Sequence, residues 1–143
     1  MNLIAFPHQQ GENPVEVDGK FFRLKGELWP LKGVAYGPFG QDPKIDAFAS
    51  RERTLKDFEL IRSAGFNALR VYHLPPQWFM DMAQDHALKL WIDLQWGQHH
   101  AFLDSKRDRQ KIRKDIAFKV RQIANHSSIF ALCIGNEISS ELI

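Results

Sequence analysis

The stretch Ile-Phe-Ala-Leu-Cys-Ile-Gly-Asn-Glu-Ile at positions 129–138 decides the fold. Its six consecutive apolar residues, several of which favour extended backbone, predict a strand buried on both faces, which is typical of a parallel sheet. Asn136 and Glu137 follow this strand directly after Gly135. Because residues just past a parallel strand point into the ligand crevice of α/β folds, Glu137 is the first candidate for a catalytic role. The plain alternative is that Glu137 only begins a loop or caps the next helix.

The same combination of strand and helix repeats along the preceding chain. Strands are predicted at residues 32–36, 67–72 and 88–94, and helices at residues 51–64 and 77–86. A longer helix begins after a cap at Asp104 or Ser105. The expected buried stripes are Leu55, Phe58, Ile61 and Ala64 in the first helix, and Ile112, Ile116, Val120 and Ile123 in the last. Strands that alternate with amphipathic helices predict parallel pairing with right-handed crossovers.

A short antiparallel lead-in precedes this pattern. Residues 14–30 alternate in the manner of β-strands and contain the pair Asp18-Gly19, which predicts a tight hairpin turn. We therefore expect residues 1–30 to form a β-hairpin lead-in and residues 31–143 to form four βα units of a single, partial (β/α)₈ domain.

Two α/β architectures fit this order of elements. An open, doubly wound sheet would be expected to carry a glycine-rich nucleotide fingerprint, and Gly33, Gly37 and Gly40 do not have its spacing. The alternative is the N-terminal half of a (β/α)₈ barrel, in which function collects at the C-terminal ends of the strands. Polar and aromatic residues follow all four predicted strands: Tyr36; Arg70 and His73; Gln95, Trp96, His99 and His100; and Asn136 and Glu137. This distribution favours the half-barrel.

Composition narrows the function classes. The chain has 143 residues, of which 44% are apolar and 25% charged, and a formal net charge of +2, as in an ordinary globular protein. Its basic run at residues 106–114 is interrupted by Asp108, which indicates a solvated helix face and argues against nucleic acid as a partner. No apolar run approaches the about 20 residues that span a bilayer, and no secretory signal is recognised, so no membrane association and a cytoplasmic location are expected.

Metal and redox chemistry are not expected either. The single cysteine, Cys133, lies within the predicted strand and is interpreted as a small core residue. The neighbouring His99 and His100 do not make a metal site without a third ligand. We therefore expect no cofactor and no metal.

Three segments together resemble a known group of enzymes. Residues 31–34 (Leu-Lys-Gly-Val), 65–75 (Gly-Phe-Asn-Ala-Leu-Arg-Val-Tyr-His-Leu-Pro) and 135–137 (Gly-Asn-Glu) resemble the catalytic barrel of retaining glycoside hydrolases, nearest to the family 2 type. The loop at residues 96–104 is similar to barrel segments of long bacterial proteins that join a hydrolase-like barrel to a glycosyltransferase. The resemblance covers about residues 20–140.

The resemblance implies a role for each of six residues. Glu137 matches the general acid/base, Asn136 the residue that holds the sugar 2-hydroxyl, Arg70 the arginine that braces the nucleophile and His73 a substrate-contacting histidine, while Trp96 and His99 lie in a position suited to sugar contacts. From the residues alone, Arg70 could equally be an ordinary ion-pairing residue and the histidines surface residues. Retaining enzymes of this kind need a second carboxylate about 5–5.5 Å from the acid.

The chain also departs from the pattern. The family's nucleophile is a glutamate after the seventh strand, whereas only four strands are predicted here, so the chain is read as a fragment that carries half of the catalytic pair. Asp93 and Asp104 are the nearest alternative acids, but Asp93 falls within the third strand and Asp104 serves better as a helix cap. Ala87 stands where the family commonly has glycine.

The expected function is therefore hydrolysis of O-glycosidic bonds by a retaining mechanism in a completed barrel. The expected partners are a carbohydrate substrate and either the missing C-terminal half-barrel or a second copy of the chain. The alternative is a non-catalytic half-barrel that binds carbohydrate or assembles as a homodimer.

Overall fold

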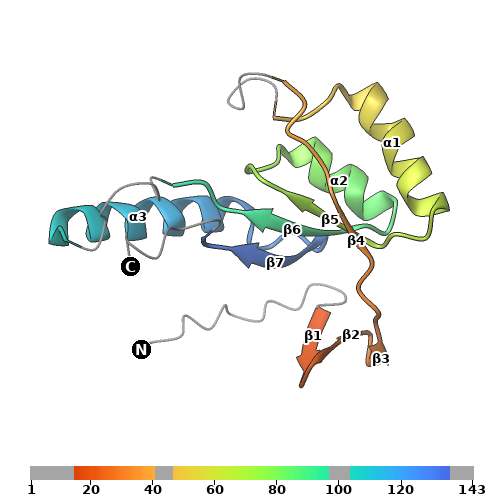
Figure 1. The fold of residues 1–143 in the computed structure, drawn as a ribbon, viewed down its shortest axis with the longest axis horizontal. Coiled ribbons are helices and arrows are strands. Elements are labelled where there is room, and N and C mark those ends of the chain that lie inside the picture. Colours follow the sequence, from red (N-terminus) through yellow and green to blue (C-terminus); the bar gives the residue numbers. More distant parts are fainter. Residues whose placement is uncertain (1–14, 41–46, 97–103, 136–143) are drawn as a thin grey trace.

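The computed structural model describes residues 15–40, 47–96 and 104–135, which form two sheets and three helices (Figure 1). The elements in chain order are β1 (Val15–Asp18), β2 (Phe21–Leu24), β3 (Glu27–Leu28), β4 (Gly33–Ala35), α1 (Arg51–Ser63), β5 (Ala68–Val71), α2 (Gln77–Asp85), β6 (Lys89–Asp93), α3 (Lys106–Ile123) and β7 (Ile129–Cys133).

The larger sheet confirms the predicted parallel topology. Its strands lie in the order β4-β5-β6-β7, and each neighbouring pair is parallel. Arg70 pairs with Ala35 on one side and with Trp91 on the other, and Asp93 pairs with Cys133. All four strands therefore end at the same edge of the sheet, as in one half of a (β/α)₈ barrel.

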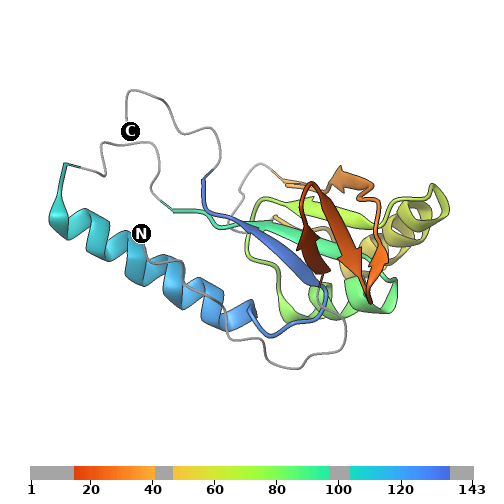
Figure 2. The same cartoon turned by 90° about the horizontal axis from the view of Figure 1, so that it is seen from below.

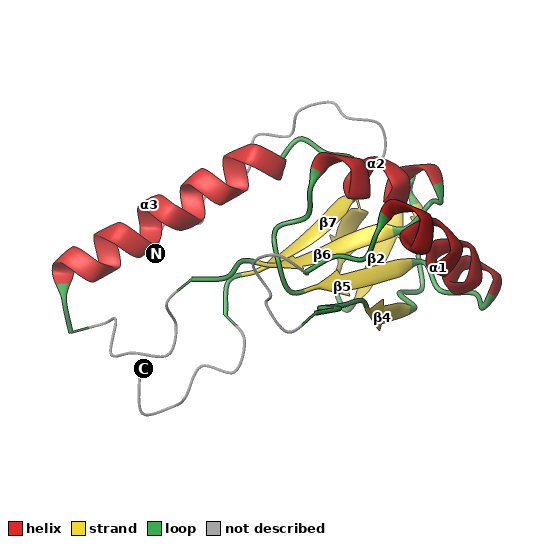
Figure 3. Cartoon of the chain, turned by 90° about the horizontal axis from the view of Figure 1, so that it is seen from above, coloured by secondary structure: helices red, strands yellow, loops and turns green. Residues whose placement is uncertain are grey.

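The two faces of this sheet have different neighbours. Helices α1 and α2 cover one face and the small sheet β1–β3 lies on the other, as the views from below and above show (Figures 2 and 3). The core under the helices contains Tyr36, Phe58, Leu69, Val71, Phe79, Met80, Ala83, Leu88, Leu90, Ile92, Leu94 and Ile123. Because side chains alternate along a strand, Arg70, Trp91 and Asp93 point to the opposite face, which is the inner face of a barrel.

The lead-in is antiparallel, as predicted, but it has three strands rather than a single hairpin, and its first turn is displaced by one residue. Asp18 still pairs with Phe21, so the turn consists of Gly19 and Lys20, and Gly19 takes the positive φ of +60° that a tight hairpin requires. The lead-in sheet meets β7 through aromatic side chains. The ring centroids of Phe22 and Trp29 lie 5.9 and 5.4 Å from that of Phe130.

The predicted buried stripe of α1 is partly wrong. Leu55 is 40% exposed and Ala64 lies at the exposed end of the helix, whereas Thr54 is fully buried beside Phe58. Leu55 and Ala64 are nine residues apart, which is about two and a half helical turns, so they lie on opposite sides of the helix. The spacing of Thr54, Phe58 and Ile61, at four and then three residues, is the one that stays on a single face.

Strand β7 is less buried than predicted. Every residue of Ile129–Cys133 is half-buried, and Ile134 is 62% exposed, because β7 is an edge strand of the described sheet. Cys133 is therefore a half-buried residue rather than a core residue, and its thiol donates a hydrogen bond to the carbonyl oxygen of Gly135 at 2.8 Å.

Helix α3 begins at the predicted cap and projects beyond the sheet (Figure 3). The hydroxyl of Ser105 accepts a hydrogen bond from the backbone N–H of Asp108 at 3.1 Å. Of the predicted stripe, Ile123 is buried, while Ile116 and Val120 are partly buried against the core. The helix is thus held through its C-terminal half. None of the helices within the described ranges is long and apolar enough to cross a membrane.

Ala87 occupies a turn that favours glycine. Its φ is +53°, in the left-handed region, between α2 and β6. This geometry explains why glycine is common at this point in the family pattern, since a side chain with Cβ is strained there.

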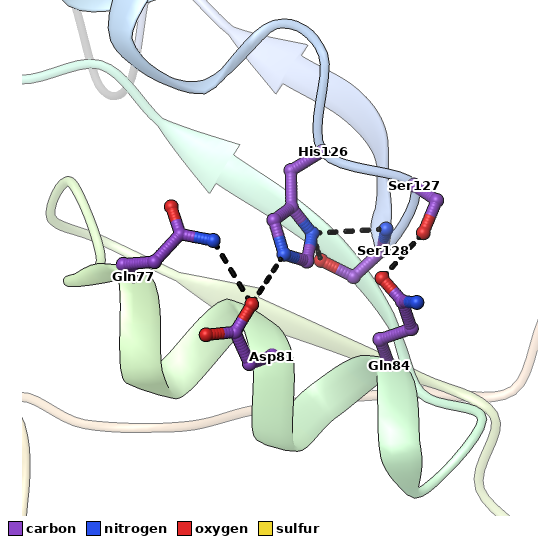
Figure 4. Close-up of polar contacts among 6 residues, drawn as sticks. All are labelled: Gln77, Asp81, Gln84, His126, Ser127 and Ser128. Atoms are coloured by element: carbon purple, nitrogen blue, oxygen red, sulfur yellow. Dashed lines mark hydrogen bonds and ion pairs between the residues drawn. The ribbon is translucent and has the colours of Figure 1, made fainter. Parts of the chain in front are cut away.

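A group of polar contacts joins α2 to the turn before β7 (Figure 4). The Nε2 of His126 lies 3.0 Å from Oδ1 of Asp81, and its Nδ1 lies 2.8 Å from the hydroxyl of Ser128. The backbone N–H of Ser128 also donates to Nδ1, so Nδ1 is an acceptor and Nε2 carries the proton that is donated to Asp81. Gln77 donates to the same Asp81 oxygen at 2.9 Å. These contacts tie the start of β7 to the helix layer.

Removing a core side chain should destabilise the fold in proportion to its burial. Leu69 is 0% exposed and Leu60 is 67% exposed. We expect Leu69→Ala to lower the free energy of unfolding by about 2–5 kcal/mol, because it leaves a cavity beneath the helices. Leu60→Ala, the matched control, should change it little. Urea unfolding followed by circular dichroism measures both, and equal effects would contradict the observed burial.

The contact between Asp81 and His126 should contribute to stability in a pH-dependent way. Hydrogen bonds from His126, and then from Gln77, lower the pKa of Asp81 below its ordinary value of 3.8. Since the folded state then favours the charged carboxylate, this contribution is present above that value and is lost as the pH falls through the lowered pKa. Asp81→Asn should lower the free energy of unfolding at pH 7 and have progressively less effect in acid. Asp85→Asn, an exposed position on the same helix, is the control. If the difference in the free energy of unfolding between the wild-type protein and Asp81→Asn does not change with pH, this account is refuted.

Candidate active site

The inner face of the parallel sheet carries a partly buried ion pair near its C-terminal edge. Arg70 on β5 donates two hydrogen bonds to Asp93 on β6, from Nε to Oδ1 at 3.2 Å and from Nη2 to Oδ2 at 2.7 Å. The Asp93 side chain is only 2% exposed, whereas that of Arg70 is 36% exposed. The carboxylate is therefore enclosed, and the guanidinium reaches from it toward solvent.

Two aromatic rings flank this arginine. The guanidinium carbon of Arg70 lies 5.0 Å from the ring centroid of Tyr72 and 5.8 Å from that of Trp91, which are cation–π distances. The hydrogen bonds to Asp93 raise the pKa of Arg70 above its ordinary value and outweigh the opposing effect of burial. Arg70 is thus a permanently charged group held by three neighbours at the predicted active-site edge.

Tyr36 faces away from this edge, although it directly follows β4. It is 6% exposed, and its ring packs in the helix-side core against Phe58 and Phe79. Its hydroxyl donates to Asp57 at 2.9 Å. Burial raises the pKa of Tyr36 to about 12. The expectation that Tyr36 joins the polar residues at the strand ends is therefore wrong.

His73 lies two residues after β5 and is half-buried. Burial lowers the pKa of its imidazole below the ordinary value of 6.5. The ring is consequently neutral at neutral pH, so it can donate one hydrogen bond and accept another.

The loop after β6 is fixed to both neighbouring strand ends. The side-chain amide of Gln95 donates to the backbone carbonyl of Tyr72 at 2.9 Å, and the indole N–H of Trp96 donates to the carbonyl of Ile134 at 2.7 Å. The amino group of Lys119 on α3 donates to the carbonyl of Gln95. These contacts bring the segments after β5, β6 and β7 together, and they hold the indole of Trp96 at the C-terminal edge of the sheet.

Three of the predicted site residues, Glu137, Asn136 and His99, lie outside the described residues. Asp104 is described and exposed, and the neighbouring Ser105 supplies the helix cap instead. Within residues 15–40, 47–96 and 104–135, no group of three His, Cys, Asp or Glu side chains could hold a metal ion.

Sequence reasoning missed the partnership of Arg70 with Asp93 and the bridging role of Gln95. The signal for the partnership was present in principle. Arg70 is paired with Trp91, and Asp93 is two residues further along the same strand, which puts all three side chains on one face. Only the strand register, however, shows that they are neighbours.

Comparison with known proteins shows the family of this chain. A family model described as glucanosyltransferase matches residues 6–142. The 1,3-beta-glucanosyltransferase gel2 of Aspergillus fumigatus is 25% identical over 142 residues, which cover 90% of this chain and 30% of that protein. A second A. fumigatus strain has a gel2 protein with the same values. The chain thus spans about a third of the length of these curated relatives.

Solved structures show the same fold in barrel enzymes. The GH2 beta-galacturonidase of Eisenbergiella tayi has a TM-score of 0.67 and 20% identity over 91% of this chain and 24% of that one. The beta-glucuronidase of Bacteroides uniformis has a TM-score of 0.64 and 20% identity over 84% of this chain and 14% of that one. The exo-chitosanase CsxA of Amycolatopsis orientalis has a TM-score of 0.65 and 12% identity over 84% of this chain and 15% of that one. At these identities the likeness establishes the fold, which is that of a partial barrel.

The buried position of Tyr36 should be visible in an alkaline titration. Because its pKa is raised from 10.0 to about 12, folding favours the protonated phenol, and the free energy of unfolding should fall as the pH rises between these values. The ultraviolet absorbance of tyrosinate should therefore show a step near pH 12 that Tyr36→Phe removes. The chain has two tyrosines, so Tyr72→Phe is the control and should retain that step. Loss of the step from Tyr72→Phe alone would contradict the assignment.

Proposed function

This chain belongs to the glucanosyltransferase family, and from that premise we propose that it forms the acid/base half of a retaining active site that cleaves and re-forms bonds in a β-1,3-glucan. The observation that carries the proposal is the family match over residues 6–142, combined with a parallel strand β7 that leads directly to Glu137.

The proposed substrate class follows from the names of the family and of the relatives that this chain resembles. These are glucanosyltransferases, and the gel2 proteins are named for a 1,3-β-glucan. The sequence resemblance to family 2 glycosidases agrees with the same general chemistry, because retaining hydrolases and retaining transferases differ only in the acceptor. The acceptor is water in one case and a sugar hydroxyl in the other.

The proposed mechanism has two steps. In the first, a carboxylate attacks the anomeric carbon while Glu137 protonates the glycosidic oxygen of the departing sugar, and a covalent glycosyl-enzyme forms. In the second, Glu137 accepts the proton of an incoming hydroxyl, whose oxygen attacks the same carbon and releases the carboxylate. We propose that the attacking carboxylate comes from a C-terminal half-barrel or from a partner chain.

Described residues support roles around this centre. The C-terminal ends of β5, β6 and β7 meet at one edge, so Arg70, His73 and Trp96 belong to the same region as Ile134 and Gly135, which follow β7. We assign Arg70 to orienting the nucleophilic carboxylate, since a guanidinium offers a rigid fork for such a group. Uncharged His73 is assigned to substrate hydroxyls, and the ring of Trp96 to stacking on a sugar. Asn136 and His99 are assigned to sugar contacts on the family resemblance.

A second candidate function is a non-catalytic module that binds carbohydrate or assembles as a homodimer. The half-buried edge strand β7 favours it, together with the exposed apolar residues Val17, Phe21 and Leu28 of the lead-in sheet. Unpaired strand edges and exposed apolar side chains promote association between chains. Light scattering at high protein concentration tests this candidate, and a strictly monomeric chain would count against the homodimer.

An assay of products distinguishes transfer, hydrolysis and binding. The protein expressed from the complete natural reading frame, whatever its length, is incubated with a laminari-oligosaccharide, a short β-1,3-linked glucan, and the products are measured by mass spectrometry. Products longer than the substrate support the proposed transfer, and exclusively shorter products indicate hydrolysis. Calorimetric binding without any product favours the second candidate, and neither binding nor product rejects both.

Substitution of Glu137 tests the acid/base assignment. We expect Glu137→Gln to lower kcat on laminari-oligosaccharides by about 10²–10⁴-fold, because an amide cannot exchange the proton. For a glycan whose leaving group needs no protonation, Glu137→Gln should lower the rate of the first step much less. Glu59→Gln, at an exposed position on α1, is the matched control and should leave kcat unchanged. Unaltered turnover in Glu137→Gln would remove this residue from the mechanism.

A further inference from the structure

Asp93 is the most enclosed carboxylate near the active-site edge, and its environment indicates what it does. Its side chain is 2% exposed, and both of its oxygens accept hydrogen bonds from Arg70. A nucleophile must be open to the anomeric carbon of a substrate, whereas the Asp93 side chain is almost fully enclosed. This enclosure argues against Asp93 as the second catalytic acid.

The geometry of the pair determines the orientation of Arg70. A guanidinium is planar and has five N–H donors, so two hydrogen bonds from Nε and Nη2 to one carboxylate fix the plane in which the other three donors lie. The rings of Tyr72 and Trp91, at 5.0 and 5.8 Å, further restrict the guanidinium. Asp93 itself is held by the sheet, because it is the last residue of β6 and pairs with Cys133 on β7.

We propose that Asp93 is a positioning residue, which holds the guanidinium of Arg70 in the one orientation that can brace a carboxylate at the C-terminal edge of the sheet. The inference rests on the proposed function for the identity of the braced group. The orientation of Arg70 by Asp93 does not depend on that function and can be tested separately.

The first test needs no substrate. In ¹⁵N-labelled protein, the Nε–H of Arg70, assigned from its loss in Arg70→Lys, should exchange slowly with water because it is hydrogen-bonded to Asp93. Asp93→Asn should accelerate this exchange, whereas Asp85→Asn, at an exposed position on α2, should not. Equal protection in wild type and Asp93→Asn would overturn the proposed orientation.

The second test measures turnover of laminari-oligosaccharides by the protein from the complete reading frame. Asp93→Asn should lower kcat by about 100-fold with a smaller change in KM, as expected for a misplaced catalytic group. Arg70→Lys keeps the charge but removes the fork, so it should give a similar loss. The double variant should be no worse than either single variant, and additive losses would overturn the proposal.

A chemical rescue separates positioning from nucleophilic catalysis. With an aryl laminari-oligosaccharide, azide can replace a missing carboxylate nucleophile by attacking the anomeric carbon itself, which releases the phenol and leaves a glycosyl azide of inverted configuration. Azide should not restore turnover to Asp93→Asn if the residue only positions Arg70. Rescue with this inverted product would show that Asp93 is the nucleophile and would reject the proposal.

The remaining outcomes are also decisive. If circular dichroism shows that Asp93→Asn does not fold, the kcat of Arg70→Lys is the deciding measurement. A kcat of Arg70→Lys equal to that of the wild-type protein would overturn the proposal. If the wild-type protein acts on no β-1,3-glucan, the proposed function fails, while the exchange rates of the Arg70 Nε–H still decide whether Asp93 orients it.

Discussion

The parallel direction of four neighbouring strands is the constraint on which the rest of the structure depends. Parallel strands cannot be joined by a tight turn, so each connection between them carries a helix that crosses back over the sheet. The crossovers α1 and α2 consequently lie on one face, and all C-terminal strand ends meet at one edge. This arrangement assembles Arg70, Asp93 and Trp96, which are distant in sequence, without any local motif that joins them.

Because side chains alternate along these strands, one face of the sheet carries apolar core residues and the other carries the polar residues of the candidate site. On β5, Leu69 and Val71 are buried beneath the helices, and the residue between them, Arg70, points to the inner face. A lone buried carboxylate on that face would be costly, since desolvation of an ion costs several kcal/mol. The two hydrogen bonds from Arg70 offset this cost for Asp93. The ion pair is therefore tolerable only where the register places both residues side by side.

The sequence was sufficient where a local pattern determines the structure, and insufficient where the register or the helix rotation does. Apolar runs predicted the four parallel strands, and capping residues predicted that α3 begins after Asp104 or Ser105, of which Ser105 is the cap. The rotation of α1 was predicted partly wrongly, because successive three-residue steps drift around a helix. In the structure Thr54 is buried and Leu55 is exposed. Tyr36 was expected at the site and lies in the core, since a residue just past a strand can turn to either face. The roles of all six predicted site residues remain predictions, and the positions of Glu137, Asn136 and His99 also lie outside the described residues.

Aromatic rings, two of them from the lead-in segment, pack together at the opposite end of the sheet. Phe22 and Trp29 of the lead-in segment pack edge-to-face against Phe130 near the start of β7, and Trp91 meets Phe130 from β6 with centroids 6.2 Å apart. These rings occupy the inner face of the sheet toward its N-terminal end, where they add apolar contact. The polar side chains of the candidate site lie instead at the C-terminal edge of the sheet. There, the contacts of Gln95 and Trp96 fix neighbouring loops to one another. One end of the sheet thus supplies packing, and the other holds side chains in defined orientations.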